Sequence, residues 1–274
     1  VFKALAINSQ RTESKPDEMV VVYANNNNTP TPVSPVVINN SVVDAIDKNA
    51  TLHLMVVGID KYQNKTMQLN YAMADARAFK LAIEKVAATV ISNIKTYLVY
   101  DEEANKAGIT GAFSNVQKNA QPQDVFVFYY AGHGVISEKN KEFYLVPNNV
   151  TDLKNADAAL QQNGIASKLL QQYAIDIPAQ KQLFILDACQ SAGAFEQLVA
   201  TDAGQQKNIA NVARSTGTHW IAASGSQQFA NEFSALGHGA FTYVLLQALN
   251  GEAANNKMIT VNGLKYFLQV QVPA

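Results

Sequence analysis

Two apolar runs, each of which ends abruptly in small and polar residues, constrain the fold of this chain most strongly. Residues 125–131 are almost all aromatic or aliphatic and lead into His133. Residues 183–186 are equally apolar, and Cys189, the only cysteine, follows three residues later. Such runs are typical of strands buried on both faces of a parallel sheet. Because ligands bind just beyond the carboxyl ends of such strands, an imidazole and a thiol should meet at one sheet edge. A Cys–His nucleophilic pair needs that arrangement.

From residue 51 onward, strand and helix patterns alternate along the chain. We expect strands at residues 52–58, 94–100, 125–130, 182–187 and 219–223, a hairpin at 135–146, and helices at 72–86, 109–119, 165–173, 241–249 and 261–270. Repeated β–α units predict an α/β fold in which a mainly parallel central sheet carries helices on both faces.

Residues 1–50 differ from the rest of the chain. Residues 20–23 favour a strand, and the Asn- and Pro-rich residues 25–35 favour a linker. Residues 2–23 are either the last hairpin of an upstream β-sandwich or an extended arm on the following domain. We therefore expect residues 1–50 to be an N-terminal extension, or the end of an upstream β-rich domain plus linker, in a longer multidomain chain.

Composition narrows the classes of function. The chain has 274 residues, 48% of them hydrophobic and 16% charged, with a net charge of −1. These values are ordinary for a soluble globular domain and give no electrostatic reason to expect nucleic acid or membrane partners. A single cysteine excludes an internal disulfide and fits a reducing compartment, which favours a cytoplasmic location. No nucleotide-binding loop or zinc-ligand spacing is present, so neither a metal nor a cofactor is expected.

The motifs at the two strand ends resemble those of the caspase–metacaspase superfamily of cysteine peptidases. They read Tyr-Ala-Gly-His-Gly at residues 130–134 and Asp-Ala-Cys-Gln-Ser at residues 187–191. The Asp two residues before the Cys looks more like metacaspases and bacterial caspase-like proteins than animal caspases. The 56-residue step from the His to the Cys also fits the family. Four further segments are similar, at residues 54–62, 70–76, 143–147 and 237–243.

This resemblance covers residues 51–274 and implies a caspase-like three-layer peptidase domain acting as a cysteine endopeptidase. It implies that Cys189 is the nucleophile, that His133 is the general base, and that the backbone N–H groups of Gly134 and Cys189 form the oxyanion hole. Two alternatives stay open: Cys189 is a buried, inert thiol, or the domain is a pseudo-protease that serves as an interaction module. A second Gly-His-Gly precedes a helical run, so we expect His238 to be structural or to lie at the rim of the site.

The resemblance also implies a protein or peptide substrate with Arg or Lys before the scissile bond. In metacaspase-like enzymes, carboxylates matching Asp75 and Asp187 line the S1 pocket for that side chain. Ala131 stands where many metacaspases have Ser, which should loosen hydrogen bonding there. Alternatives are a different preference at that position, and a role for Asp75 as a helix N-terminal charge. Some metacaspases depend on calcium; no EF-hand-like loop is present, so calcium activation stays open.

Residues 195–217 form a polar stretch that contains Lys207 and Arg214. In this superfamily, the segment that joins the large and small parts of the domain is often cut during activation. Ile209 and Val212 have helical spacing, so we expect an ordered helix in an uncut chain. The alternative is self-cleavage after Lys207 or Arg214.

Overall fold

The computed structural model describes residues 2–4, 17–19, 47, 49–153, 157–188, 218–223, 237–255 and 258–272. Cys189, the strand expected at residues 20–23 and the segment 195–217 lie outside these residues. The chain divides into two compact units, Val1–Asp44 and Ala45–Ala274.

The first unit contains one antiparallel pair of short strands. It joins β1 (Phe2–Ala4) to β2 (Asp17–Met19). Whether this pair belongs to an upstream β-rich domain stays a prediction.

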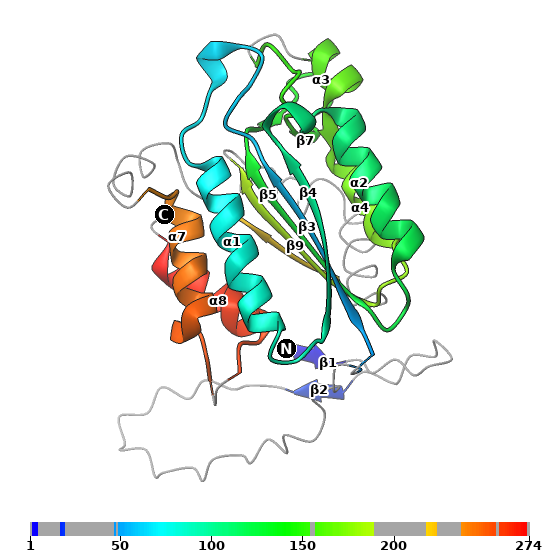
Figure 1. The fold of residues 1–274 in the computed structure, drawn as a ribbon, viewed down its shortest axis with the longest axis vertical. Coiled ribbons are helices and arrows are strands. Elements are labelled where there is room, and N and C mark those ends of the chain that lie inside the picture. Colours follow the sequence, from blue (N-terminus) through cyan, green and yellow to red (C-terminus); the bar gives the residue numbers. More distant parts are fainter. Residues whose placement is uncertain are drawn as a thin grey trace. The chain divides into compact units, whose positions relative to one another are not determined.

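The second unit is built on a five-stranded parallel sheet with the strand order β10-β9-β5-β3-β4, of which Figure 1 labels all but β10. Its strands are β3 (Thr51–Gly58), β4 (Asn93–Tyr100), β5 (Val125–Gly132), β9 (Lys181–Ala188) and β10 (Thr218–Ala222). The chain passes from β3 to β4 on one side and then crosses back to β5 on the other side of β3. The loops after β3 and β5 therefore diverge, which creates a topological switch point between them.

Helices cover both faces of this sheet (Figure 1). One face carries α1 (Ala72–Ala87), α7 (Ala240–Gln247) and α8 (Val261–Gln271), and the other carries α2 (Lys106–Asn119) and α4 (Ser167–Asp176). Aromatic rings join the layers: Phe79 of α1 stacks on Tyr129 at 4.3 Å, and Phe113 of α2 contacts Phe128 at 4.9 Å between ring centroids. The predicted three-layer α/β architecture with a mainly parallel sheet is confirmed.

Shorter elements complete the second unit. They are η1 (Lys65–Met67), η2 (Asp101–Glu103), β6 (Gly134–Ile136), β7 (Phe143–Leu145), α3 (Asp157–Asn163), β8 (Ile165–Ala166) and η5 (Ala248–Glu252). The strands β6, β7 and β8 form a small antiparallel sheet.

Two expected helices have different bounds in the structure. The helix expected at residues 165–173 begins at Ser167, because Ile165 pairs with Leu145 as part of β8. The helix expected to reach residue 249 leaves regular α-helical geometry after Gln247, and the turn that follows contains Gly251 at a φ of 118°. Glycine adopts this left-handed conformation without steric cost.

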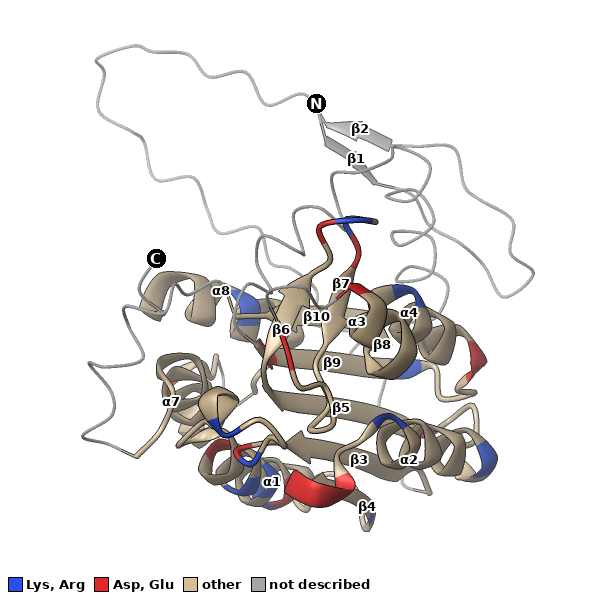
Figure 2. Cartoon of the chain, turned by 90° about the horizontal axis from the view of Figure 1, so that it is seen from above, with Lys and Arg blue, Asp and Glu red and all other residues tan. Residues whose placement is uncertain are grey.

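Charged residues of both signs are spread over the helices and loops that surround the sheet (Figure 2). Within the described part of the chain, no helix combines the length and the apolarity that are needed to cross a membrane.

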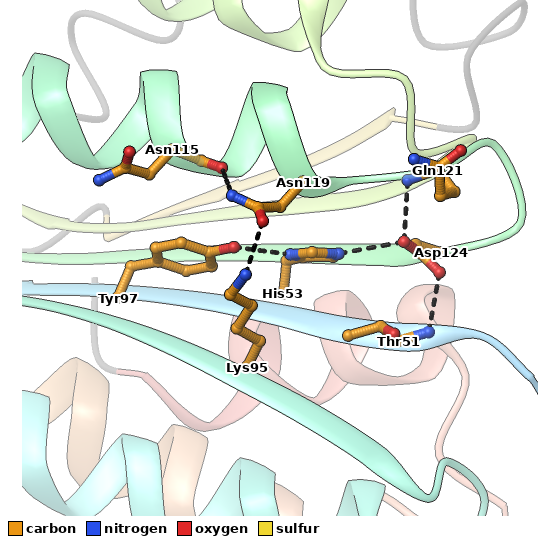
Figure 3. Close-up of polar contacts among 8 residues, drawn as sticks. All are labelled: Thr51, His53, Lys95, Tyr97, Asn115, Asn119, Gln121 and Asp124. Atoms are coloured by element: carbon orange, nitrogen blue, oxygen red, sulfur yellow. Dashed lines mark hydrogen bonds and ion pairs between the residues drawn. The ribbon is translucent and has the colours of Figure 1, made fainter.

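A buried polar cluster ties three strands together at the amino-terminal end of the sheet (Figure 3). The imidazole of His53 lies between Asp124 and Tyr97, with Nε2 3.0 Å from Asp124 Oδ2 and Nδ1 3.0 Å from Tyr97 Oη. The same carboxylate accepts the backbone N–H groups of Thr51 and Gln121, both at 2.8 Å. Burial by itself would raise the pKa of Asp124, but these three donors outweigh it and lower that pKa.

This cluster predicts how stability depends on pH. Asp124→Asn should lower the free energy of unfolding by about 1–2 kcal/mol at pH 7, because it weakens charge-assisted hydrogen bonds. The lowered pKa contributes stability above the unfolded-state pKa of about 4, and this contribution is lost as pH falls through the folded-state pKa. Urea unfolding should therefore show that the difference in the free energy of unfolding between wild type and Asp124→Asn is smaller at pH 3 than at pH 7. The exposed Asp176→Asn is the control, and a constant or widening gap contradicts this role for Asp124.

Candidate active site

The carboxyl ends of the neighbouring strands β5 and β9 position the candidate catalytic residues. Gly132, the last residue of β5, pairs in register with Ala188, the last residue of β9. His133 and Cys189 therefore follow two backbone positions that lie side by side, at the spacing of about 4.8 Å between neighbouring strands. His133 is also the single residue between β5 and β6, so both sheets constrain its backbone.

Hydrogen bonds fix the position and the tautomer of His133. Its backbone N–H donates to Tyr62 Oη at 2.8 Å, and its ring Nε2 lies 2.7 Å from the carbonyl oxygen of Met67. A carbonyl can only accept, so Nε2 carries the proton and the neutral ring has its lone pair on Nδ1. Burial lowers the pKa of His133, although the bond to Met67 acts in the opposite direction. The ring is thereby favoured as a neutral base.

The loop after β3, which carries Met67 and Tyr62, is held by Asp101. The Asp101 carboxylate accepts the backbone N–H groups of Asp60 and Lys61, both at 2.9 Å. Asp101 itself has a left-handed φ of 39°, a conformation that Asp and Asn tolerate better than most residues. The Asn148 side chain also donates to the Asp101 carbonyl at 2.6 Å. Asp101 thus positions, through this loop, the carbonyl that orients the imidazole.

Gly134 offers a backbone donor beside the end of β9. The Val146 N–H donates to the His133 carbonyl at 3.0 Å, and the next pair along the ladder is Gly134 with Leu145. Hydrogen-bonded and non-hydrogen-bonded pairs alternate along antiparallel strands. The N–H of Gly134 therefore points away from β7. A Cβ at Gly134 would lie 3.0 Å from Ala188 Cβ and 2.7 Å from a neighbouring phenylalanine ring, so glycine allows this close approach.

Asp75 and Asp187 come together on the opposite face of the sheet from α2. Asp75 lies in the first turn of α1, and Asp187 pairs in register with Ala131 of β5. Both carboxylates flank the start of α7: a Cβ at Gly239 would lie 3.0 Å from Asp75 Oδ2 and 3.8 Å from Asp187 Oδ2. We call Asp75 and Asp187 the acidic pair.

Neutral hydroxyl groups orient one member of the acidic pair. Thr242 Oγ1 of α7 donates to Asp187 Oδ2 at 2.6 Å, and it lies 2.6 Å from Tyr129 Oη. Because the Thr242 proton goes to the carboxylate, the Tyr129 hydroxyl donates to Thr242, and such chains of hydrogen bonds reinforce one another. Asp187 is therefore held without a charged partner among these groups.

His238 and the start of α7 bind the other member. Nδ1 of His238 lies 2.7 Å from Asp75 Oδ1, and the Gly239 N–H donates to the two Asp75 oxygens at 3.3 and 3.1 Å. Asp75 is therefore more than a helix N-terminal charge of α1, because its side chain connects α1 to α7. His238, which we expected to be structural or at the rim, contacts a residue expected to bind substrate.

Electrostatics disfavour two negative charges in the acidic pair. Burial, and then repulsion by Asp187, raise the pKa of Asp75 to about 8. Burial also raises the pKa of Asp187, to about 6, although the nearby hydroxyl groups of Thr242 and Tyr129 oppose the shift. A bound cation would lower both pKa values, because it would offset the loss of hydration and the repulsion between the two carboxylates.

The structure brings the expected residues into two groups. Asp75, Asp187 and Ala131 form one group, and His133 and Gly134 form the other beside the end of β9; Cys189 lies outside the described residues. Three residues of the site were not predicted from the sequence, namely Met67, Asp101 and Thr242. Only Thr242 carried a signal, because it lies within the 237–243 motif. In the ranges that the structure describes, no group of three or more His, Cys, Asp or Glu side chains is arranged to hold a metal ion.

Comparisons with known proteins identify a family for most of the chain. The sequence model of the family described as caspase domain matches residues 52–264. The chain is similar in structure to the protein GSU0716 from Geobacter sulfurreducens, with 14% identity, coverage of 81% of this chain and 89% of that chain, and a TM-score of 0.48. It is also similar to the Drosophila initiator caspase Dronc, with 9% identity, coverage of 86% and 80%, and a TM-score of 0.46. A search of curated proteins finds no match.

Proposed function

Because the chain belongs to the caspase-domain family, we propose that residues 51–274 are a cysteine endopeptidase domain with Cys189 as nucleophile and His133 as general base. The observation that carries this proposal is the 2.7 Å contact between His133 Nε2 and the Met67 carbonyl. This contact assigns the ring proton to Nε2 and leaves Nδ1 as the basic atom. Within the described part of the chain, Nδ1 makes no hydrogen bond that would compete for its lone pair.

The proposed reaction moves one proton back and forth through Nδ1. His133 Nδ1 takes the proton of the Cys189 thiol, and Sγ attacks the peptide carbonyl carbon. The N–H groups of Gly134 and Cys189 bind the oxygen as its negative charge develops. Nδ1–H then protonates the amine as the C–N bond breaks, which leaves a thioester on Cys189. Finally, Nδ1 deprotonates a water molecule that attacks the thioester. The C–S bond then breaks, the acid product leaves, and Nδ1–H returns its proton to the Cys189 thiolate.

The acidic pair supports Arg or Lys as the residue before the scissile bond. Two partly desolvated carboxylates bind a cation through charge-assisted hydrogen bonds, and an acidic side chain in the same place would add a third repelling charge. An animal-caspase site instead uses arginine to hold Asp. The chain has three arginines, and Arg77, the one that the structure describes, is exposed.

The proposed activity is tested by incubating the purified chain with a peptide library and sequencing the products by mass spectrometry. New product C-termini should be Arg or Lys, and Cys189→Ala should generate none of them. Equal cleavage by Cys189→Ala, or no cleavage by wild type, would reject the peptidase assignment.

A prediction for Asp101 follows from the loop that it holds. Asp101→Gly keeps the left-handed backbone but removes both side-chain hydrogen bonds, so the Met67 carbonyl should lose its fixed position. We expect kcat to fall about tenfold, because misplacing a catalytic group by a fraction of an ångström to an ångström carries a cost of this order or more. Asp101→Asn keeps an acceptor and the backbone preference, and should retain most of the activity. Steady-state kinetics and thermal unfolding of both variants provide the test. An unchanged kcat in a folded Asp101→Gly protein contradicts the positioning role.

A further inference from the structure

His238 binds the Asp75 carboxylate, which is also where the cationic side chain of a substrate would bind under the proposed function. Its Nδ1 lies 2.7 Å from Asp75 Oδ1, and the side chains of His238 and Asp75 are 24% and 5% exposed. Asp75 is therefore nearly covered, whereas the imidazole that bonds to it reaches solvent. A cation that approaches Asp75 from solution on this side therefore contacts the imidazole before it can contact Oδ1.

The charges around this contact are mostly negative. Asp75 faces His238 from α1, Asp187 faces the same region from β9, and Asp60, in the loop after β3, adds further repulsion to Asp75. Tyr129, below Asp187 on β5, is a neutral donor because burial raises its pKa well above the ordinary value. Among the described side chains, His238 is the only one able to carry a positive charge that forms an ion pair with Asp75 or Asp187.

We propose that His238 is a specificity-determining residue: an exchangeable partner of Asp75 that the cationic side chain of a substrate must displace. The proposal rests on the proposed function, in that the acidic pair binds the residue before the scissile bond. His238 and the Gly239 N–H both contact Asp75 when no substrate is present, and the Gly239 donor stays in place when the imidazole is displaced, so the buried carboxylate keeps a hydrogen bond during the exchange. The exchange favours cationic substrates: a guanidinium or ammonium group gains a charge-assisted hydrogen bond that offsets the loss of the imidazole contact, whereas a neutral donor gains only an ordinary one.

A purely structural role for His238 predicts the opposite effect of its removal. If His238 only fastened α7 to α1, its loss would loosen the acidic pair and weaken cation binding. If His238 is displaced by the cation, its loss removes a competitor and strengthens cation binding. The direction of the change in affinity therefore separates the two roles.

The test measures the affinity of the full chain for butylguanidine, with neutral butylurea as the isosteric control. Calorimetry at pH 8.5, above the pKa of about 8 of Asp75, should show His238→Ala binding butylguanidine about three- to tenfold more tightly than wild type, as expected when one competing hydrogen bond is removed. His219→Ala, which replaces another partly exposed histidine, should bind as wild type does. Unchanged or weaker binding by His238→Ala, or no binding by either protein, overturns the proposal.

A second measurement uses wild type alone and does not depend on how any variant folds. With 13C-labelled histidine, saturation by butylguanidine should shift the His238 ring resonances, and butylurea should leave them in place. Butylguanidine binding without a shift at His238 contradicts displacement. Neither measurement requires catalysis, so the exchange can hold even if no peptide is cleaved, and it can fail in an active peptidase.

Discussion

Replacing His133 with Ala should lower kcat/KM on an arginyl peptide by roughly a thousandfold, and replacing Cys189 with Ala should abolish turnover. General-base catalysis is worth about 10²–10⁴-fold, and without the imidazole the thiol has no proton acceptor held beside it. Without the thiol, no thioester can form. Initial rates on a peptide with a fluorogenic leaving group measure both losses, and thermal unfolding shows that the variants remain folded.

Two further histidine variants are the matched controls for this prediction. His219→Ala should leave kcat/KM unchanged, because His219 lies on β10 and enters no step of the proposed reaction. His238→Ala should leave kcat far closer to the wild-type value than His133→Ala does, because His238 contacts Asp75 instead of the reacting atoms. Turnover by Cys189→Ala, or equal losses from His133→Ala and His238→Ala, would contradict the assignment of nucleophile and base.

The second large effect is expected in substrate preference. Peptides with Arg before the scissile bond should be cleaved at least about a hundredfold faster than peptides with Asp there. Asp187→Asn should lower kcat/KM on the arginyl peptide roughly tenfold to a hundredfold, which corresponds to about 1.5–3 kcal/mol for a lost charge-assisted contact. Asp75→Asn should act in the same direction, and Asp176→Asn on α4 should have no effect. Comparable cleavage after Asp, or an unchanged preference in both acidic-pair variants, would contradict the role of the acidic pair.

The raised pKa values of the acidic pair give this preference a pH dependence. A carboxyl group with a raised pKa stays protonated to higher pH, and only its ionised form attracts a cation strongly. The pKa values of about 6 for Asp187 and about 8 for Asp75 therefore predict that KM for the arginyl peptide falls as pH rises from 6 to 8. In Asp75→Asn this fall should be smaller.

The centre of the sheet could be predicted from the sequence because β3 and β5 are buried on both faces. Such strands form uninterrupted apolar runs, and the run at residues 125–131 is typical of a fully buried strand. Short elements were harder to predict: β8 is two residues long and exists because Ile165 pairs with Leu145, a contact distant in sequence. Local patterns at residues 165–173 favoured a helix, and tertiary pairing overrode them for the first two residues.

The candidate site was predictable where motifs carry side-chain chemistry and unpredictable where the backbone acts. Met67 orients His133 through its carbonyl oxygen, which any residue would supply, so its identity holds no signal. Asp101 accepts backbone N–H groups that lie 40 and 41 residues earlier in the chain, and only the folded loop shows this. The contact between His238 and Asp75 spans 163 residues of sequence, and the second Gly-His-Gly gave no indication of it.

Covalent labelling by a peptidyl electrophile with an arginyl residue next to the reactive ketone tests most directly whether Cys189 and His133 act as nucleophile and base. We expect one adduct, located on Cys189 by peptide mapping. The adduct should form much more slowly in His133→Ala, and far more slowly in wild type when Asp replaces the arginyl residue. Labelling of Cys189 at the same rate in wild type and His133→Ala, or no adduct on Cys189, would contradict a Cys189–His133 peptidase.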